Sequence, residues 1–534
     1  MTHCWRIRPP RPACRFTVAV VTTGLLSSCA TFVPDARTPE QLVSLPDSFT
    51  LYGPVAPAPD RWWKSFENAE LSALVEESLR GNFSLQQAYA RLRQAGALAR
   101  QARAARFPTL GYSADASVSR TYTDVATASV SPADTATNTL NALGALASGG
   151  SGGVISATSL QSAQSRLQAL DTLFGSPDSV DETTTTESYA VGLSASYEVD
   201  LWGRVRAGYE ASRLSLEASR QDLYDAMQSI AAQVTYTWLD LLYDRQVLAV
   251  VHQQLETNQD NLELLELRYR NGQSSALDIY QQRQAVAQSA AAIPSLEAGI
   301  QTLQHQLAVL LGKAPTIDLG LTADRYPELG LLPEQGLPAD LLAKRSDVRA
   351  AGLRLASADW DVSAARADRL PALSLTGTTD FNGASVSTLF DNWLARLAGS
   401  VTGPIFDAGR RKAEVERTRA VVDEYLAAYR GTVITAMLEV EDALVHEARQ
   451  RDYIEALTAQ YEAAKASLEE ARVRYRKGLN DYLPVLSALT NQQSLEQSLV
   501  AARHDLLYYR VQLHLALGGD WTAEEAAYTE EVSQ

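Results

Sequence analysis

The stretch Arg268-Tyr269-Arg270-Asn271-Gly272 returns as Arg474-Tyr475-Arg476-Lys477-Gly478, 206 residues further along the chain. The same offset relates Leu311-Gly312 to Leu517-Gly518, and Gly203-Arg204 to Gly409-Arg410. A constant offset over such a length indicates that one structural half is built twice. The 534 residues are therefore spent on two copies of one architecture rather than on several unrelated domains.

Each copy predicts a long helix that ends at the repeated stretch. No proline occurs between residues 203 and 270, and apolar residues recur there at intervals of three, four or seven, which is coiled-coil periodicity. These residues are Leu223, Met227, Ile230, Val234, Trp238, Leu241, Leu248, Leu255 and Leu262. At 1.5 Å per residue the helix is roughly 100 Å long. With a second long helix at 407–477 and return helices at 274–311 and 481–517, each copy becomes a hairpin whose tip lies at Gly272 or Gly478.

Four runs alternate apolar and polar residues with a period of two, at 107–122, 187–201, 371–382 and 392–405. In the second run the apolar side consists of Tyr189, Val191, Leu193, Ala195, Tyr197, Val199 and Leu201. This pattern is typical of strands that face lipid on one side and water on the other, although strands of a soluble sandwich alternate in the same way. Four strands cannot close a membrane barrel, which needs about eight. The chain is therefore expected to oligomerise, and three copies would supply twelve strands.

The first 28 residues predict an export signal. Four arginines and no acid precede an apolar run at 16–26, which is shorter than the about 20 residues that span a bilayer. The run ends in Leu26-Ser27-Ser28-Cys29, which resembles a bacterial lipoprotein signal in which the cysteine is lipidated and becomes the mature N-terminus. By the same resemblance, Ala30 points to the outer membrane. An ordinary signal peptide with a chance cysteine is the alternative.

Loss of this signal changes the charge and the cysteine content of the chain. The net charge falls from −16 to −20, because four arginines are removed and no acid. Cys4 and Cys14 leave with the signal and Cys29 is bound to lipid, so the mature chain has no thiol for an internal disulfide. The acidic balance argues against a nucleic-acid partner.

One segment breaks the symmetry between the copies, because residues 123–186 have no counterpart in the second copy. The segment is rich in glycine, serine and threonine and predicts a long loop outside the cell. Its residues 149–153 match a G-x-S-x-G nucleophile motif, but composition alone produces this match and no strand and helix flank it. The chain has neither a metal-ligand spacing nor a phosphate-binding loop. We therefore expect no enzymatic activity, no cofactor and no metal.

Several further runs, taken in order, resemble one known family. They are Trp62-Trp63-Lys64-Ser65-Phe66, Tyr197-Glu198-Val199-Asp200-Leu201-Trp202-Gly203-Arg204, residues 104–108, Arg345-Ser346-Asp347-Val348, Pro404-Ile405-Phe406-Asp407-Ala408-Gly409-Arg410-Arg411 and the two tip sequences. Over roughly 480 residues the chain resembles the TolC/OprM-type outer-membrane efflux channels in their lipoprotein branch.

The resemblance implies an α+β membrane protein. It implies a homotrimer with a 12-stranded outer-membrane β-barrel, four strands per chain, continued by a periplasmic α-helical barrel of coiled-coil hairpins. The trimer would be a passive exit duct for small molecules, which a periplasmic adaptor and an inner-membrane pump of the RND type deliver. Two alternatives stay open: the outer channel of a type I protein secretion system, and a non-conducting coiled-coil scaffold tethered by lipid.

The resemblance also implies residue roles at the hairpin tips. Asp278 matches the position of a gate aspartate, and Tyr475 matches the tyrosine that hydrogen-bonds to it. Gly272, Gly478, Arg270 and Arg476 match the region where adaptors dock. For Asp278 the alternative role is a solvated acid in the first helical turn, and both glycines are also expected to end long helices in the left-handed conformation.

The second tip departs from the family pattern at three positions. Pro484 and Ser487 replace two aspartates, and Asn480 replaces an arginine. The double aspartate ring is therefore not expected here, and the constriction would be less acidic.

The expected boundaries follow from these assignments. They are a signal peptide at 1–28, a lipidated N-terminal segment at 29–66, a first repeat at 67–312, a connector at 313–343, a second repeat at 344–518 and a tail at 519–534.

Overall fold

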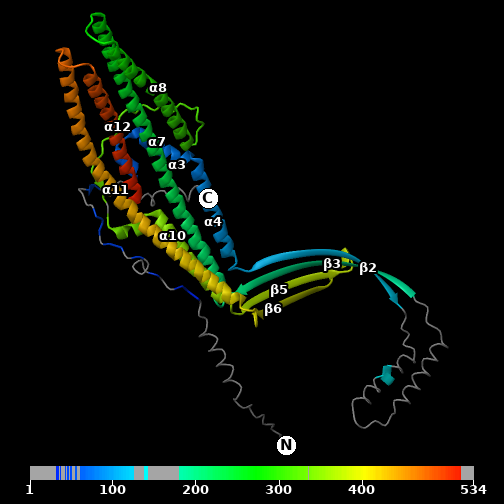
Figure 1. Ribbon diagram of the computed structural model, residues 1–534. Helices are drawn as coiled ribbons and strands as arrows, with labels where there is room; N and C mark the ends of the chain where they lie inside the picture. The colour runs from blue at the N-terminus through cyan, green and yellow to red at the C-terminus, as the bar shows by residue number, and fades with distance from the viewer. Residues whose placement is uncertain are drawn as a thin grey trace. The chain divides into compact units, whose positions relative to one another are not determined.

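A computed structural model describes residues 61–125, 138–141, 180–334 and 336–518, together with short stretches between residues 32 and 56 (Figure 1). Cys29, most of the expected loop 123–186 and the tail 519–534 lie outside the described residues. The chain divides into two compact units. The first comprises Met1–Arg106, Asp200–Ala372 and Gly403–Gln534, and the second comprises Phe107–Val199 and Leu373–Thr402.

The second unit is a four-stranded sheet in the order β2-β3-β5-β6. Its strands are β2 (Thr109–Val125), β3 (Val180–Val199), β5 (Ala372–Gly383) and β6 (Trp393–Thr402), with a short 3₁₀ turn η3 (Val386–Thr388) between the last two. β3 is antiparallel to both β2 and β5. Within this sheet β2 and β6 are the edge strands.

The pairing register places the apolar positions of three strands on one face. Tyr112 is opposite Leu193, Ala114 is opposite Val191, and Val191 is opposite Phe381. The opposite face bears the polar positions, including Ser113, Asp115, Ser194, Ser196, Thr376 and Asp380. The alternation seen in the sequence thus becomes a two-faced sheet, because directly paired residues of antiparallel strands project to the same side.

The strand β3 corrects one expectation about the loop. Thr183 to Thr186 were expected in that loop, but they pair with Ser119 to Tyr122 of β2. β-branched threonines suit a pleated strand, so the hairpin extends further than the apolar alternation alone indicates.

Two helices of 67 residues dominate the first unit, α7 (Arg204–Arg270) and α11 (Arg410–Arg476). Each is preceded by a glycine with positive φ, Gly203 at 78° and Gly409 at 87°. An aspartate caps each start: Asp200 accepts from the backbone amides of residues 205 and 206, and Asp407 accepts from those of residues 409 and 411. The second helix therefore begins at residue 410 rather than at 407.

Each long helix pairs with a return helix of 35 residues. α8 (Ala276–Leu310) returns along α7, and α12 (Leu483–Leu517) returns along α11, so these four helices form two helical hairpins (Figure 1). Among the helices of the described residues, none has both the length and the apolar character that crossing a bilayer would require.

Shorter helices pack against the halves of α7 and α11 that lie away from the hairpin tips. α4 (Phe83–Ala104) and α10 (Ser346–Ala367) each have 22 residues; α4 packs against α7, and α10 packs against both α7 and α11. η1 (Trp62–Phe66) adds Trp62, Trp63 and Phe66 to a core around Trp238 of α7, and α3 (Ala69–Gly81) adds Leu71 to the same core. A second core joins α10 and α11 through Val348, Tyr429 and Val440.

The connector between the repeats contains little regular structure. η2 (Pro338–Asp340) leads into the short α9 (Leu341–Lys344), and β4 (Leu332–Pro333) pairs in parallel with β1 (Val55–Ala56).

The buried stripe of α7 differs from the expected one toward the tip. From Leu223 to Leu241 the expected positions are buried, but Leu248, Leu255 and Leu262 are only partly buried. The fully buried line there is Val247, Val251, Gln254, Asn258 and Leu265. The helix buries two polar side chains in this half, and a pattern based on hydrophobicity does not include them.

Candidate functional site at the hairpin tips

Both hairpins turn on the repeated glycine. Gly272 and Gly478 each have a φ of 70°. At the first tip the amide of Gly272 donates to the carbonyl of Tyr269 and that of Gln273 donates to Arg268, and the second tip repeats both bonds one copy later. This pair of bonds is a Schellman motif, which ends a helix by satisfying its last carbonyls. No atom lies within 4 Å of a Cβ built on either glycine, so the backbone of both turns is open to approach.

The first return helix begins with a capping box that contains Asp278. The amide of Asp278 donates to Ser275 Oγ at 3.2 Å, and Asp278 Oδ2 accepts from the amide of Ser275 at 2.9 Å. Ser274 Oγ donates to the same Oδ2 at 2.9 Å. The carboxylate is half-buried and satisfies the free amides at the start of the helix.

Tyr475 lies in an apolar cluster formed by both hairpins. The cluster contains Leu265, Ile279, Leu468, Tyr475, Tyr482, Val485 and Leu489. The guanidinium of Arg268 lies 4.5 Å from the centroid of the Tyr475 ring, and the ring of Tyr482 meets it edge-on at 5.4 Å. Among the described residues the Tyr475 hydroxyl has no hydrogen-bond partner. The hydroxyl therefore makes no bond to Asp278 within the described residues of this chain, and Asp278 Oδ2 accepts from Ser274 and Ser275 instead.

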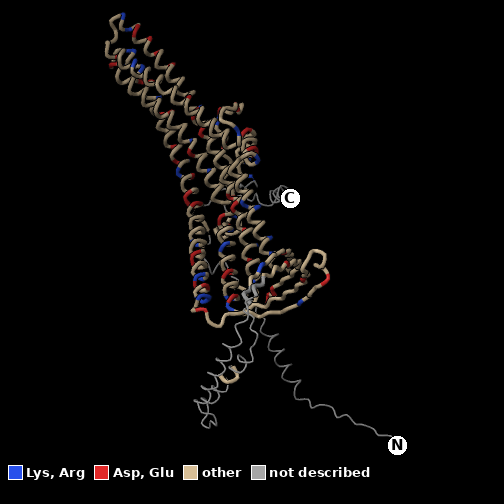
Figure 2. Tube along the Cα trace, turned by 90° about the vertical axis from the view of Figure 1, so that its right-hand side faces the viewer, with Lys and Arg blue, Asp and Glu red and all other residues tan. Residues whose placement is uncertain are grey.

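Two arginines at the tips are exposed. Arg270 and Arg476 both point to solvent, and Arg476 has only a long contact of 3.4 Å with Glu469. Acidic and basic residues are interspersed along the helices up to the tips (Figure 2).

The three residues that differ from the family pattern lie in or just before the start of α12. Pro484 is in the first turn of α12, where a proline is tolerated because that amide has no helical partner. Asn480 donates to the carbonyl of its neighbour Asp481, and Ser487 follows within α12.

Sequence reasoning missed the polar residues that join the two hairpins. Tyr482, the residue before α12, donates through its hydroxyl to Gln282 Oε1 of α8 at 2.8 Å. Gln282 Nε2 donates to the carbonyl of Asn258 in α7, also at 2.8 Å. All three residues are buried. The sequence carries one signal for them, because each of these three residues corresponds to alanine in the other copy.

The connector is fastened to the helices at a second polar site. Glu70 of α3 accepts from Trp238 Nε1 at 3.0 Å and from the amides of Thr322 and Ala323. Burial alone would raise the pKa of Glu70, but these hydrogen bonds lower it, so the carboxylate is charged. Arg245 donates to the carbonyls of residues 321 and 323 from the α7 side.

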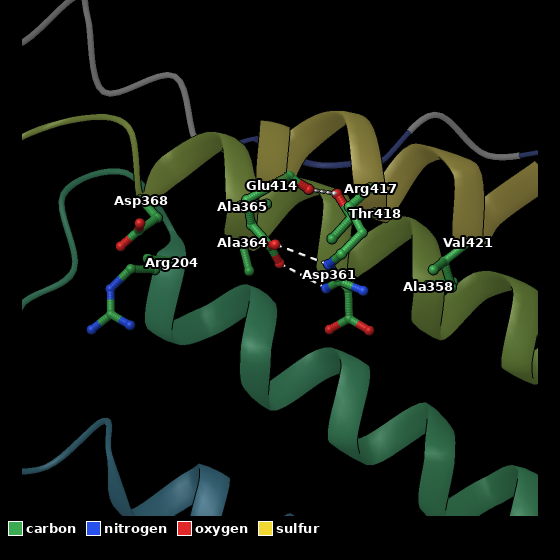
Figure 3. A pocket seen from close by; sticks show the side chains of 10 residues that line it. All are labelled: Arg204, Ala358, Asp361, Ala364, Ala365, Asp368, Glu414, Arg417, Thr418 and Val421. Atoms are coloured by element: carbon green, nitrogen blue, oxygen red, sulfur yellow. Dashed lines mark hydrogen bonds and ion pairs between the residues drawn. The ribbon is translucent and has the colours of Figure 1, made fainter. Parts of the chain in front are cut away.

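A pocket of about 480 Å³ lies between α7, α10 and α11 (Figure 3). Its walls include Arg204, Asp361, Asp368, Glu414 and Arg417. Arg417 pairs with Glu414 at 2.7 Å, as the dashed lines in Figure 3 show. Burial raises the pKa of Asp361, and the nearby Arg417 opposes that rise. Pairs of this kind are ordinary at a polar helix interface.

Comparisons with known proteins agree with this geometry. The family model described as "Outer membrane efflux protein" matches residues 168–313 and 337–519. The pyoverdine export outer membrane protein OpmQ of Pseudomonas putida is 31% identical over 472 residues, which cover 87% of this chain and 89% of that protein. The solvent efflux pump outer membrane protein SrpC of Pseudomonas putida is 31% identical over 360 residues, covering 65% of this chain and 75% of that one. The solved structure of the outer-membrane channel OprN superposes with a TM-score of 0.76 at 27% identity, over 92% of this chain and 99% of that one.

Proposed function

Because this chain belongs to the outer membrane efflux protein family, we propose that three copies form a passive duct for small molecules through the outer membrane. The chain is the outer-membrane channel component of an efflux system, as its relatives are. What we propose beyond this is the trimer, its partners and the roles of individual residues.

The two-faced sheet is the observation that supports the trimer. One face presents Leu110 and Tyr112 with 79% and 84% of their surface exposed, and β6 exposes Leu397 and Val401. Unpaired edge strands cannot face lipid, because their amides and carbonyls would have no partners there. In the proposed trimer, β2 of one copy pairs with β6 of the next, and three four-stranded sheets close a 12-stranded barrel with apolar residues toward lipid.

The hairpin tips are the proposed inner end of the duct. A ring of three Asp278 carboxylates would attract cations and resist anions, and Tyr475 lies in the cluster that holds the tips together. The exposed Arg270 and Arg476 and the open turns at Gly272 and Gly478 would meet a periplasmic adaptor, which connects the duct to an inner-membrane pump of the RND type.

Cys29 is the proposed lipid anchor, and this rests on the sequence of residues 1–30 alone. In this proposal the lipid at Cys29 and the barrel both attach the chain to the outer membrane. The substrate is set by the pump and adaptor, in keeping with relatives named for cargoes as different as pyoverdine and solvents.

Single-channel conductance in planar bilayers tests the duct and its gate. We expect a small conductance from the wild-type trimer and a clear rise in Asp278→Ala and in Tyr475→Phe. Asp278→Asn is the matched variant, because its amide oxygen still caps α8 while the charge is lost. A rise in both Asp278 variants assigns the gate to the charge, and a rise in Asp278→Ala alone assigns the effect to the cap.

If the trimer folds but no variant conducts, the proposal of a duct would be overturned, and the alternative of a non-conducting scaffold tethered by lipid would remain. A wide-open wild type would mean that the gate is lost at Pro484 and Ser487.

A further inference from the structure

The half of α7 nearest the tip buries two polar side chains in the middle of its contact stripe. Asn258 is 1% exposed and Gln254 is 6% exposed, and Val251 and Leu265 flank them on the same stripe. A polar group without a partner in such a place costs about 1–3 kcal/mol, so native proteins pair them. The partners of these two residues show that this part of α7 makes hydrogen bonds to other helices.

Nearest the tip, three buried residues form a chain of hydrogen bonds from one hairpin to the other. It runs from the hydroxyl of Tyr482 to Gln282 Oε1 at 2.8 Å, and from Gln282 Nε2 to the carbonyl of Asn258 at 2.8 Å. Gln282 is fully buried and Tyr482 is 3% exposed. Burial raises the pKa of Tyr482, so its hydroxyl keeps its proton and donates.

Further from the tip, α7 is bonded directly to α12. Gln254 Nε2 donates to the carbonyl of Gln493 and to Glu496 Oε2, both at 3.1 Å. Gln497 Nε2 donates to Gln254 Oε1 at 2.8 Å. The seam between the two hairpins of one chain therefore contains polar contacts over several helical turns, beside the apolar cluster at the tips.

The internal repeat gives this seam a natural comparison. A shift of 206 residues converts each member of the seam into its counterpart in the other copy. The counterparts of Asn258, Gln282, Tyr482 and Gln493 are Ala464, Ala488, Ala276 and Ala287. These four polar residues correspond to alanine, whereas Gln254 corresponds to Gln460. In the proposed trimer the counterpart seam lies between the second hairpin of one chain and the first hairpin of the next.

We propose that Tyr482, Gln282 and Asn258 form a latch that holds the second hairpin against the first within each chain and thereby sets the closed position of the tips. The latch rests on the proposed function, since a closed tip has meaning only in a conducting duct. Hydrogen bonds are directional and weaken steeply when partners move apart. Contacts between alanines have no such directional requirement. The counterpart seam between neighbouring chains therefore does not fix the position of the hairpins at this level, and the latch within each chain does. These three are positioning residues and need not line the pore.

Tyr482→Phe tests the latch with the loss of one oxygen atom. It leaves Gln282 Oε1 buried without a donor, and the loss of one hydrogen bond of about 1.4 kcal/mol corresponds to a change of about tenfold in an equilibrium. We expect the open fraction in single-channel records to rise by about 5- to 10-fold.

Tyr461→Phe is the matched control. The Tyr461 hydroxyl accepts from Gln492 Nε2 at 3.2 Å, and this bond joins α11 to α12 within the second hairpin. Its loss removes a similar bond without touching the seam between hairpins, so the open fraction is expected to stay at the wild-type value.

The double variant Tyr482→Phe with Gln282→Leu separates a latch from a merely structural role. It removes both polar partners, so thermal stability of the trimer is expected to recover toward wild type. The open fraction is expected to stay raised, because no bond reforms. Recovery of both quantities together would overturn the latch, as would equal effects of Tyr482→Phe and Tyr461→Phe.

The same recordings distinguish the latch from the proposed function. A wild type that conducts and an unchanged Tyr482→Phe would overturn the latch alone. A folded trimer that conducts in no variant would overturn the duct and the latch with it.

Discussion

At the scale of single residues, two histidines of α12 have opposite environments. His514 is buried, stacks on the ring of Trp62 at 5.8 Å and lies 3.2 Å from Ser65 Oγ. Burial, helped by the positive charge of Arg510, lowers the pKa of His514 to about 3. Burial alone would also lower the pKa of His504, but its bonds to Asp240 at 2.9 Å and Asp505 at 3.2 Å raise it.

These two shifts predict how stability depends on pH. The unfolded chain protonates His514 below its ordinary pKa of 6.5, but the folded chain does so only near 3. The contribution of His514 is therefore complete above pH 6.5 and is lost as pH falls toward 3. The loss between pH 6.5 and 5 is about 2 kcal/mol. We expect denaturant unfolding of the detergent-solubilised protein to show this loss, and His514→Phe to reduce it.

His504→Gln is the opposite control for the same measurement. The raised pKa of His504 contributes stability that is fully present below pH 6.5 and is lost as pH rises through the pKa of the folded chain. Removing His504 should therefore abolish a loss of stability above pH 6.5 and leave the loss between pH 6.5 and 5 nearly unchanged. An acid loss that is unchanged in His514→Phe would show that His514 titrates normally in the folded chain.

At the scale of elements, a buried ion pair fastens the connector to the second hairpin. Arg510 of α12 and Glu447 of α11 are 3% and 1% exposed and lie 2.6 Å apart. Arg510 also donates to the carbonyls of Gly330 and Leu331, and Arg451 donates to Glu447 at 2.9 Å. One guanidinium thus joins two helices and a segment that has little regular structure of its own.

Arg510→Met is expected to destabilise the protein by about 3–5 kcal/mol, because Glu447 would keep its charge in a buried place with only Arg451 as partner. The measurement is the midpoint of denaturant unfolding at pH 7. In the double variant with Glu447→Leu, most of the loss should be recovered, since the uncompensated charge is gone.

Arg449→Met controls for the loss of an arginine, at a position on α11, the helix that carries Glu447. Its pair with Asp452 is exposed at 75% and 64% of the side-chain surface, so the expected change is between about 0 and 1 kcal/mol. Equal effects of Arg449→Met and Arg510→Met would contradict the special role of the buried pair.

At the scale of the whole molecule, the two-faced sheet decides how the chain meets the membrane. Ala114 shares the apolar face with Val191 and Phe381, whereas its neighbour Asp115 lies on the polar face. In the proposed barrel the first face meets lipid and the second meets the water-filled lumen.

Arginine at these two adjacent positions tests that assignment. We expect Ala114→Arg to cost about 2–4 kcal/mol of barrel stability and to reduce the amount of heat-resistant trimer in outer-membrane fractions. Asp115→Arg, at the same depth, should leave the trimer intact and shift the ion selectivity of the channel toward anions. The reverse result would mean that the faces are exchanged.

Much of this fold could be predicted because its signals are local and repeated. A long α7 and α11 follow from periodic apolar residues without proline and from glycines that end the helix at 272 and 478. The strands follow from a period of two. The prediction was wrong at two places that have no hydrophobic pattern. Thr183 to Thr186 extend β3 although they were expected in the loop. Gln254 and Asn258 lie on the buried stripe of α7, where Leu255 and Leu262 were expected.

The tip residues were only partly accessible to the same reasoning. Capping by Asp278 follows from its position three residues after Ser275. The link from Tyr482 to Gln282 joins side chains 200 residues apart, so no local pattern contains it. The gate and docking roles of the tip residues stay predictions.

The sequence by itself determined the duplication, the hairpins, the alternating strands and the family, because each depends on spacing along the chain. Only the tertiary structure decided which buried groups meet: Arg510 with Glu447, His514 with Trp62, and the seam of Tyr482, Gln282 and Asn258. The physical reason is that hydrophobic periodicity specifies which face of a helix is buried, whereas the pairing of buried polar atoms depends on contacts between helices distant in sequence.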